Sequence, residues 1–339
     1  MIPILDSFTA RPGRLDDLRG LHRARYLPGA RERGMRVVAE WRSPGEARDG
    51  CSGEWRLLWA LPDVAAWWAM RGRASVDPEV ASFWRDADER LEARSRRMLV
   101  PESESQASPP RRARPAPGAL SGRRTTALLR LAAGAGAAER ARVEALARSL
   151  PQRARGCLRS EIGANLPGSI HGGDHTLDLV FDGAEPAARW CEAAATDRGA
   201  HEAFEGLVAR IDAVHYALLE GGLDAPQIAS PLKRTLLLRV EPGAPPERVA
   251  RFERELAAMP DHVLAIRNWH FARVEDPRAS WTHVWAQDFE NLGGLHGDYM
   301  VHPYHWAYVD RWFDPESTER LVALDFAHVF CTLPKSVLG

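Results

Sequence analysis

The sequence lacks the features that define several large classes of protein. Its 45 basic and 46 acidic residues give a formal net charge of −1, which provides no overall field to attract nucleic acid or an anionic membrane. No stretch approaches the roughly 20 apolar residues of a membrane-spanning helix, and the start has no basic segment followed by an apolar core. We therefore expect a cytoplasmic protein that binds neither nucleic acid nor membranes.

Motifs for metals and nucleotides are absent as well. The glycines form no phosphate-binding loop, because the spacing and the Lys-Ser/Thr pair that such a loop needs are missing. No histidine stands where it would complete a zinc site with a cysteine. The sequence thus predicts no metal and no nucleotide cofactor. It predicts reduced, mostly buried thiols at four isolated positions: Cys51, Cys157, Cys191 and Cys331.

Composition along the 339 residues indicates three pieces of about 100 residues each, a usual domain size. Residues 101–122 are rich in Pro, Ser, Arg and Gly and predict a disordered linker, because such a segment cannot bury enough apolar surface to fold. A weaker break falls at residues 221–231. The expected modules therefore span residues 1–100, 123–222 and 232–339.

The three pieces repeat one order of elements: strand, helix, strand, strand, helix. In the first piece the closing helix is expected over residues 77–98, and in the second around residues 201–214. In the third piece residues 320–330 complete the order. Short helices between alternating strands favour an antiparallel sheet with helices on one face. The fold class is therefore α+β, with three tandem ferredoxin-like modules.

Sheets of this kind leave one face bare, and exposed apolar faces tend to become buried. We expect the modules to pair sheet to sheet as in dimeric α/β-barrels, and the short connection favours a pair formed by the second and third modules. The sheet of the first module then keeps an unpaired face. This face predicts a homodimer.

Chemistry is expected between residues 281 and 313, which hold four of the twelve histidines and three of the five tyrosines. Imidazole titrates near neutral pH, and aromatic surroundings shift its pKa. Alternation along the strand 281–289 places five side chains on one face, the face expected to meet the helices: Trp281, His283, Trp285, Gln287 and Phe289.

A helix is expected to begin at about Pro303, since proline suits the first helical turn. His305 then lies on the helical stripe that faces the strand. His283 and His305 would point into one cavity walled by tryptophan, with Tyr299 on the turn just before the helix.

Simpler roles compete at several of these positions. A single histidine on an apolar strand is often a hydrogen-bonded core residue, and His302, which precedes a proline, also fits a helix cap. Arg234, on the neighbouring strand, could equally pair with a carboxylate such as Asp325. A metal site is not indicated, because the histidines lack a ligand pair on one helical face and no acidic residue is placed to ligate.

The third module resembles the stress-responsive dimeric α/β-barrel family, known as the Dabb family. The strings that carry the resemblance are T-H-V-x-x-x-x-F from Thr282 and D-Y-x-x-H-P-x-H-x-x-x-V-D-R-W from Asp298. The first module resembles the related NIPSNAP and EthD-type folds. The resemblance implies ferredoxin-like modules that dimerise into a barrel, and enzymes that include cofactor-free aldol cyclases of the olivetolic acid cyclase type.

Roles follow from the resemblance position by position. It implies that His305 is the catalytic base and that Tyr299 and His283 assist. A family histidine on the first strand of the module is replaced by Arg234, which stays charged and would anchor an anion or stabilise an enolate. Two histidines of the second module stand at related positions and suggest a modified second site: His175 and His201.

Our leading hypothesis is a cofactor-independent acid/base enzyme, a lyase, cyclase or isomerase with aldol or retro-aldol type chemistry on an aromatic or polyketide-like small molecule. No cofactor is expected. The alternatives are a non-catalytic stress protein that holds a hydrophobic ligand, and a cofactor-free or haem-dependent oxygenase. The residues expected to bind the substrate surround the base: Arg234, Trp281, Trp285, Phe289, His302 and Trp306.

Overall fold

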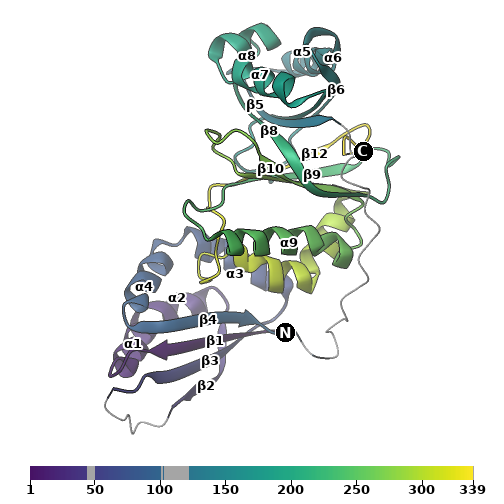
Figure 1. Cartoon of the computed structure of the whole chain (residues 1–339). Helices are drawn as coiled ribbons and strands as arrows, with labels where there is room; N and C mark the ends of the chain where they lie inside the picture. The colour runs from purple at the N-terminus through teal and green to yellow at the C-terminus, as the bar shows by residue number, and fades with distance from the viewer. Residues whose placement is uncertain (44–49, 101, 103–121, 339) are drawn as a thin grey trace. The chain divides into compact units, whose positions relative to one another are not determined.

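The computed structural model describes residues 1–43, 50–100, 102 and 122–338 (Figure 1). Most of the predicted linker, residues 101–122, therefore lies outside the described residues. None of the helices in the described part of the chain is long and apolar enough to cross a membrane.

The chain divides into two compact units. Unit 1 comprises residues 1–109 and 300–321, and unit 2 comprises residues 110–299 and 322–339. The division differs from the predicted modules chiefly at residues 300–321. The sequence assigns this segment to the third module, whereas its contacts place it with the first.

Unit 1 is built on one antiparallel sheet whose strands lie in the order β2-β3-β1-β4. Its helices lie over one face of the sheet (Figure 1). The strands are β1 (Ile2–Ala10), β2 (Arg36–Arg42), β3 (Gly53–Leu61) and β4 (Leu91–Met98). The helical segments are α1 (Leu15–Leu21), η1 (His22–Tyr26), α2 (Leu27–Glu32), α3 (Val64–Val76), α4 (Pro78–Asp88), η5 (Tyr304–Val309) and η6 (Asp310–Trp312).

Alternation along the strands builds the core of unit 1. Every second residue of β1 is buried, which places Ile4 and Phe8 in the same apolar cluster as Trp55 and Trp59 of β3. The Phe8 and Trp55 rings stack with their centroids 4.8 Å apart. No helix in the described part of unit 1 lies over the opposite face of the sheet.

The single helix predicted over residues 77–98 is wrong. The structure divides this stretch into α4 and the strand β4, which pairs antiparallel with β1. A buried ion pair supports the strand, because Arg96 of β4 meets Asp6 of β1 with 2.7 Å between Nε and Oδ1. Leu91 is therefore buried as the first residue of a strand, although its spacing continues the helical stripe.

Unit 2 contains one sheet of eight strands in the order β12-β9-β11-β10-β8-β5-β7-β6. Bridges between residues 165–170 and residues 328–331 connect its two ends, so the sheet is barrel-like. The strands are β5 (Arg123–Leu131), β6 (Cys157–Ala164), β7 (His175–Phe181), β8 (Val208–Leu223), β9 (Leu232–Leu238), β10 (Asn268–Val274), β11 (His283–Phe289) and β12 (Ala327–Thr332). The helical segments are α5 (Ala137–Arg148), α6 (Leu150–Arg153), α7 (Ala184–Ala194), α8 (Asp197–Phe204), α9 (Pro246–His262) and η4 (Gly294–Tyr299).

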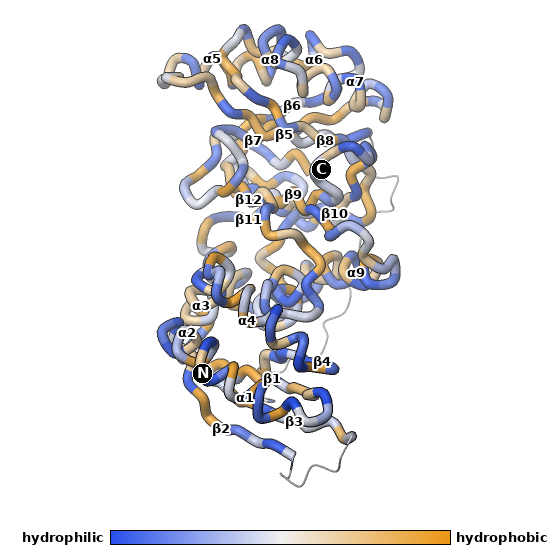
Figure 2. The backbone as a smooth tube through the Cα atoms, turned by 90° about the vertical axis from the view of Figure 1, so that its left-hand side faces the viewer, coloured by the Kyte–Doolittle hydropathy of each residue, from blue (hydrophilic) through white to orange (hydrophobic). Residues whose placement is uncertain are grey.

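The strand order shows three copies of one module. When the strands are counted along each module, both halves of the unit 2 sheet have the order 4-1-3-2, and so does the sheet of unit 1. The prediction of three ferredoxin-like modules is confirmed, and the second and third modules share one sheet. Hydrophobic residues gather along these strands, whereas hydrophilic residues are frequent on the helices (Figure 2).

The helix predicted around residues 201–214 is also wrong. The helix α8 ends before this stretch does, at Glu205, whose φ of 54° is left-handed and stops the helical path. The strand β8 follows and runs into the predicted break at residues 221–231. It is this long because it pairs with β5 along one part and with β10 along the other.

Candidate functional site

Arg234 occupies the middle of β9, a strand in which every residue is buried. Its Nε donates a hydrogen bond to Nε2 of His328 at 2.8 Å, and its Nη1 donates to Oε1 of Gln287 at 2.5 Å. Gln287 lies directly opposite Arg234 on β11, and His328 lies on β12. Three neighbouring strands therefore hold one guanidinium.

This guanidinium has no acidic partner. Among the described residues, no carboxylate lies within ion-pair distance of Arg234, and Nη2 makes no hydrogen bond. Asp325, the partner considered from the sequence, pairs instead with Arg239 at 2.5 Å. Burial lowers the pKa of Arg234, with the phenol of Tyr299 opposing the shift. A buried positive charge without a counterion lowers the stability of the fold. We therefore interpret Arg234 as a functional residue and not a structural one.

Aromatic rings surround the same side chain. The guanidinium carbon lies 5.0 Å from the centre of the Tyr299 ring, and that ring meets Phe289 edge to face at 5.4 Å. The amide nitrogen of Gln287 is buried and has no hydrogen-bond partner. Arg234 and Gln287 thus offer unused donors beside apolar walls, an arrangement that can bind a carboxylate, a phenolate or an enolate oxygen.

His283 lies at the start of β11 with both ring nitrogens engaged. Nδ1 lies 2.8 Å from Oγ1 of Thr282, and Nε2 lies 2.9 Å from Oε1 of Glu253 on α9. Its ring stacks on Phe271 with the centroids 5.5 Å apart. Burial alone would raise the pKa of Glu253, but the hydrogen bonds from His283 and Arg273 lower it to about 2. The structure therefore holds His283 firmly in one orientation.

The remaining aromatic residues of the strand divide between two faces. Trp285 meets Phe271 edge to face at 5.5 Å, so it shares a cluster with His283. Trp281 precedes β11 and belongs instead to the apolar cluster that contains Val284, on the opposite face. Its indole nitrogen donates to Asp212 at 3.0 Å. The predicted common face of Trp281 and His283 is wrong, because the alternation does not extend beyond the strand.

His305, His302 and Trp306 all lie in unit 1. The His305 ring is 5.0 Å from the ring of Trp68 on α3. Nδ1 of His302 accepts a hydrogen bond from the Tyr304 amide at 3.1 Å, which fits the predicted capping role. Trp306 is buried in the core of unit 1 and donates to the carbonyl of residue 301.

The structure thus brings together Arg234, Tyr299 and Phe289 in unit 2, with His283 and Trp285 on the same strand face. His305 belongs to the other unit, and its convergence with His283 stays a prediction. Sequence reasoning did not assign Glu253, Gln287 or His328 to the site, although Gln287 and His328 accept the hydrogen bonds of Arg234. Strand alternation did place Gln287 on the correct face of β11, and this was the signal that could have identified it. Within the described ranges, no three His, Cys, Asp or Glu side chains cluster closely enough to hold a metal ion.

Comparison with known families identifies the domain around Arg234. Residues 232–327 match the family described as Stress responsive A/B Barrel Domain, or Dabb. This part of the chain is similar to Dabb domains. The resemblance seen in the third module is therefore confirmed, and it includes β9, β11 and the start of β12.

Two solved structures are similar to parts of the chain. A NIPSNAP domain protein from Burkholderia xenovorans is similar over 32% of this chain and 100% of its own length, with 18% identity and a TM-score of 0.26. An anthrone oxidase-like protein is similar over 63% of this chain and 91% of its own, with 10% identity and a TM-score of 0.47. No curated protein sequence matches the chain.

Proposed function

We propose that this protein is a cofactor-independent acid/base enzyme that acts on a small aromatic or polyketide-like molecule. The Dabb domain supports a role as a small-molecule enzyme or binding protein. The observation that carries the proposal is Arg234, a buried guanidinium beside the Tyr299 ring that has no carboxylate partner among the residues the structure describes. Its chemistry suits a substrate with a carboxylate, a phenolate or a carbonyl that becomes an enolate.

Each proposed residue has one task. His305 removes a proton from carbon next to the carbonyl, a role that contributes roughly 10² to 10⁴-fold when the base titrates near the working pH. The Tyr299 hydroxyl stabilises the enolate oxygen. Arg234 and the unpaired amide of Gln287 bind the anionic group, and His283, fixed by Glu253, orients the side chains around it.

A test that needs no knowledge of the natural substrate uses 4-acetylbenzoate in deuterated water. This probe carries an aromatic ring, a carboxylate and slowly exchanging protons next to a ketone. The enzyme removes one methyl proton, and the enolate takes a deuteron from solvent, so proton NMR follows the loss of the methyl signal. We expect the wild-type protein to accelerate exchange and His305→Ala to abolish the acceleration. Exchange that His305→Ala leaves unchanged would remove His305 from the mechanism.

A ligand-binding protein without catalysis is the second candidate. The observation that favours it is the engagement of both His283 nitrogens, which leaves this histidine no obvious part in proton transfer. Binding of 4-acetylbenzoate in the same NMR sample without any accelerated exchange would support this candidate against the enzyme. Oxygen uptake during the incubation would instead point to the oxygenase alternative.

A further inference from the structure

The segment that carries His302 and His305 is anchored inside unit 1. Residues 300–321 form η5 and η6 and group with the first module, although they follow the third module in the sequence. The contacts that hold the segment come mainly from α3 and from the sheet of unit 1. His305 therefore depends for its position on residues more than two hundred positions earlier in the chain.

The first anchor is Trp68 of α3. Its indole nitrogen donates a hydrogen bond to the carbonyl of Met300 at 3.0 Å, five residues before His305. The Trp68 ring also lies against His305, with 5.0 Å between the ring centroids. The Trp68 side chain thus holds the start of the segment and also contacts the imidazole ring of His305.

The second anchor is Arg71, one turn further along α3. Its Nε and Nη2 donate to the two carboxylate oxygens of Asp310 at 2.7 and 3.3 Å, and Nη1 lies 3.3 Å from Asp314. All three side chains are buried. Asp310 follows His305 by five residues, so Trp68 and Arg71 hold the chain on both sides of the histidine. A two-point attachment of this kind restricts the orientation of the side chain between the points.

A third contact set fastens the end of the segment. The Glu316 carboxylate lies 2.8 Å from Arg96, and it accepts hydrogen bonds from the Tyr26 hydroxyl at 2.5 Å and from the Trp84 indole at 3.1 Å. Glu316 is fully buried. Since this set lies eleven residues beyond His305, it stabilises the segment without touching the histidine directly.

We propose that Trp68 and Arg71 are positioning residues for His305, so that helix α3 of the first module sets the orientation of the proposed base. The inference rests on the proposed function, which makes His305 the base. Spacing on α3 favours it, because residues three apart on a helix project from the same side.

The decisive experiment compares full-length variants by two independent measurements. The first is the exchange of 4-acetylbenzoate, and the second is the NMR signal of the His305 imidazole in protein with isotope-labelled histidine. Trp68→Phe keeps an aromatic wall but loses the indole hydrogen bond, and Arg71→Met removes the ion pairs. For both variants we expect kcat to fall about 10-fold or more with KM within about twofold, because positioning affects the reacting geometry more than binding.

The imidazole signal separates this inference from the proposed function. Ring-current shifts depend on the distance to Trp68, so we expect the His305 signal to move in Arg71→Met, which leaves the Trp68 ring unchanged, whether or not the protein is an enzyme. Trp68→Phe alters the ring current directly and is therefore judged by kcat alone. Arg73→Met is the matched control, since Arg73 lies on the same helix and bonds only backbone carbonyls of residues 69 and 32. Arg71→Lys should restore part of the effect, because lysine keeps the charge but cannot contact both carboxylates in the same way.

Two results would overturn the inference. One is a His305 signal in Arg71→Met that matches wild type and Arg73→Met. The other is full exchange activity in both variants while His305→Ala is inactive. If wild type shows no exchange activity but the imidazole signal moves in Arg71→Met, the proposed function fails and the positioning of His305 by α3 stands. Circular dichroism confirms folding of each variant, and Arg71→Lys provides the mild change for the imidazole signal if Arg71→Met fails to fold.

Discussion

The second and third modules share a backbone, yet the side chains under their helices differ. His175 lies opposite Leu129 in the second module, and His283 lies opposite Leu238 at the matching place in the third. Each histidine faces a glutamate at the eighth position of the module's first helix, Glu144 in α5 (Ala137–Arg148) or Glu253 in α9 (Pro246–His262). The histidine and glutamate pair therefore occurs in both modules, and its presence alone does not mark the candidate site.

The two modules differ four residues further along the same strands. Arg234 and Gln287 of the third module correspond to Thr125 and Leu179 of the second, since each pair lies opposite in register. Likewise His328 corresponds to Ala213. The second module fills this place with the apolar cluster under its helices. The third module thus differs from the second in Arg234 and its two hydrogen-bond partners, and not in His283, which the sequence analysis had emphasised.

The largest expected effect is on ligand binding, when the polar residues at the Arg234 site are replaced by apolar ones as in the second module. The variant Arg234→Met/Gln287→Leu/His328→Phe should weaken binding of 4-acetylbenzoate at least about 100-fold, a loss of about 3 kcal/mol, while acetophenone, which lacks the carboxylate, changes little. The free energy of unfolding should stay equal or rise by about 1 kcal/mol, because a buried unpaired charge has been removed. Calorimetric titration and thermal unfolding measure the two quantities.

The control for this variant is Arg239→Met. Arg239 directly follows β9 but pairs with Asp325, and 41% of its side chain is exposed. It should leave binding of both probes unchanged. Equal loss of binding of the carboxylate probe and the neutral probe in the triple variant would contradict the anion site.

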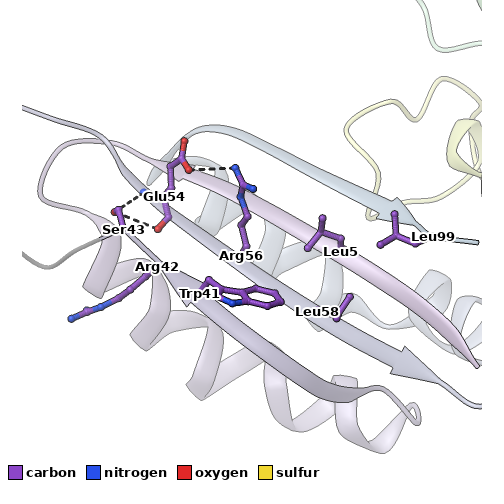
Figure 3. Close-up of a pocket in the computed structure, with 8 residues that line it drawn as sticks. All are labelled: Leu5, Trp41, Arg42, Ser43, Glu54, Arg56, Leu58 and Leu99. Atoms are coloured by element: carbon purple, nitrogen blue, oxygen red, sulfur yellow. Dashed lines mark hydrogen bonds and ion pairs between the residues drawn. The ribbon is translucent and has the colours of Figure 1, made fainter. Parts of the chain in front are cut away.

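A second large effect concerns the sheet face of the first module. In unit 2 the two halves cover each other's inner faces with a buried apolar cluster. In unit 1 the matching face forms an open groove of about 620 Å³ that includes Trp41, half exposed at 53% (Figure 3). Glu54 and Arg56 give this face both signs of charge, so two copies related by a twofold axis can complement each other.

We propose that a second copy of the chain covers this face. Trp41→Glu should convert a dimer to a monomer in light scattering at micromolar concentration, since a buried like-charge pair replaces an aromatic contact and weakens association about 100-fold or more. Val76→Glu, at an exposed position on α3, should leave the dimer intact. A wild-type chain that is monomeric throughout this range would contradict the proposal.

The sequence predicted most of the elements of each module correctly, but it predicted a helix where the last strand of the first and second modules lies. Alternating strands such as β1 and β11 were readable because one face of each meets the helices. In contrast, β4 contains three arginines and one glutamate and continues a helical spacing from α4, so nothing local marks it as a strand. Its pairing with β1 and the ion pair between Arg96 and Asp6 are tertiary effects.

The site was predictable in part for the same reason. Periodicity could place His283, Gln287 and Phe289 on one strand face, and all three lie there. It could not show that residues 300–321 pack with the first module, because the partners of Asp310 and Glu316 lie more than two hundred residues away. Nor could it tell whether Arg234 has an acidic partner, since that depends on which strands become neighbours.

A smaller effect tests whether the two histidines have become different. His283 makes hydrogen bonds through both nitrogens, whereas the nitrogens of His175 make none and Nε2 lies 3.6 Å from Glu144. His283→Leu should therefore lower the free energy of unfolding by about 1–3 kcal/mol, and His175→Leu should change it by less than about 0.5 kcal/mol. Urea unfolding at pH 7.5 measures both. Equal losses would mean that the two pairs serve the fold in the same way.

The smallest expected effect is the pH dependence that Glu253 adds to the third module. Its pKa of about 2 in the folded chain lies below the ordinary value of 4.5, so the folded state favours the charged carboxylate. This contribution is fully present above about pH 4.5 and is lost as the pH falls through 2. Glu253→Gln should lower the free energy of unfolding by about 1 kcal/mol at pH 7, after allowance for partial solvent screening, and by nearly nothing at pH 2.5.

Thermal melts across this pH range measure the difference in stability, with Glu144→Gln as the matched variant in the second module. A constant difference between Glu253→Gln and wild type at every pH would show that packing, and not charge, links Glu253 to His283.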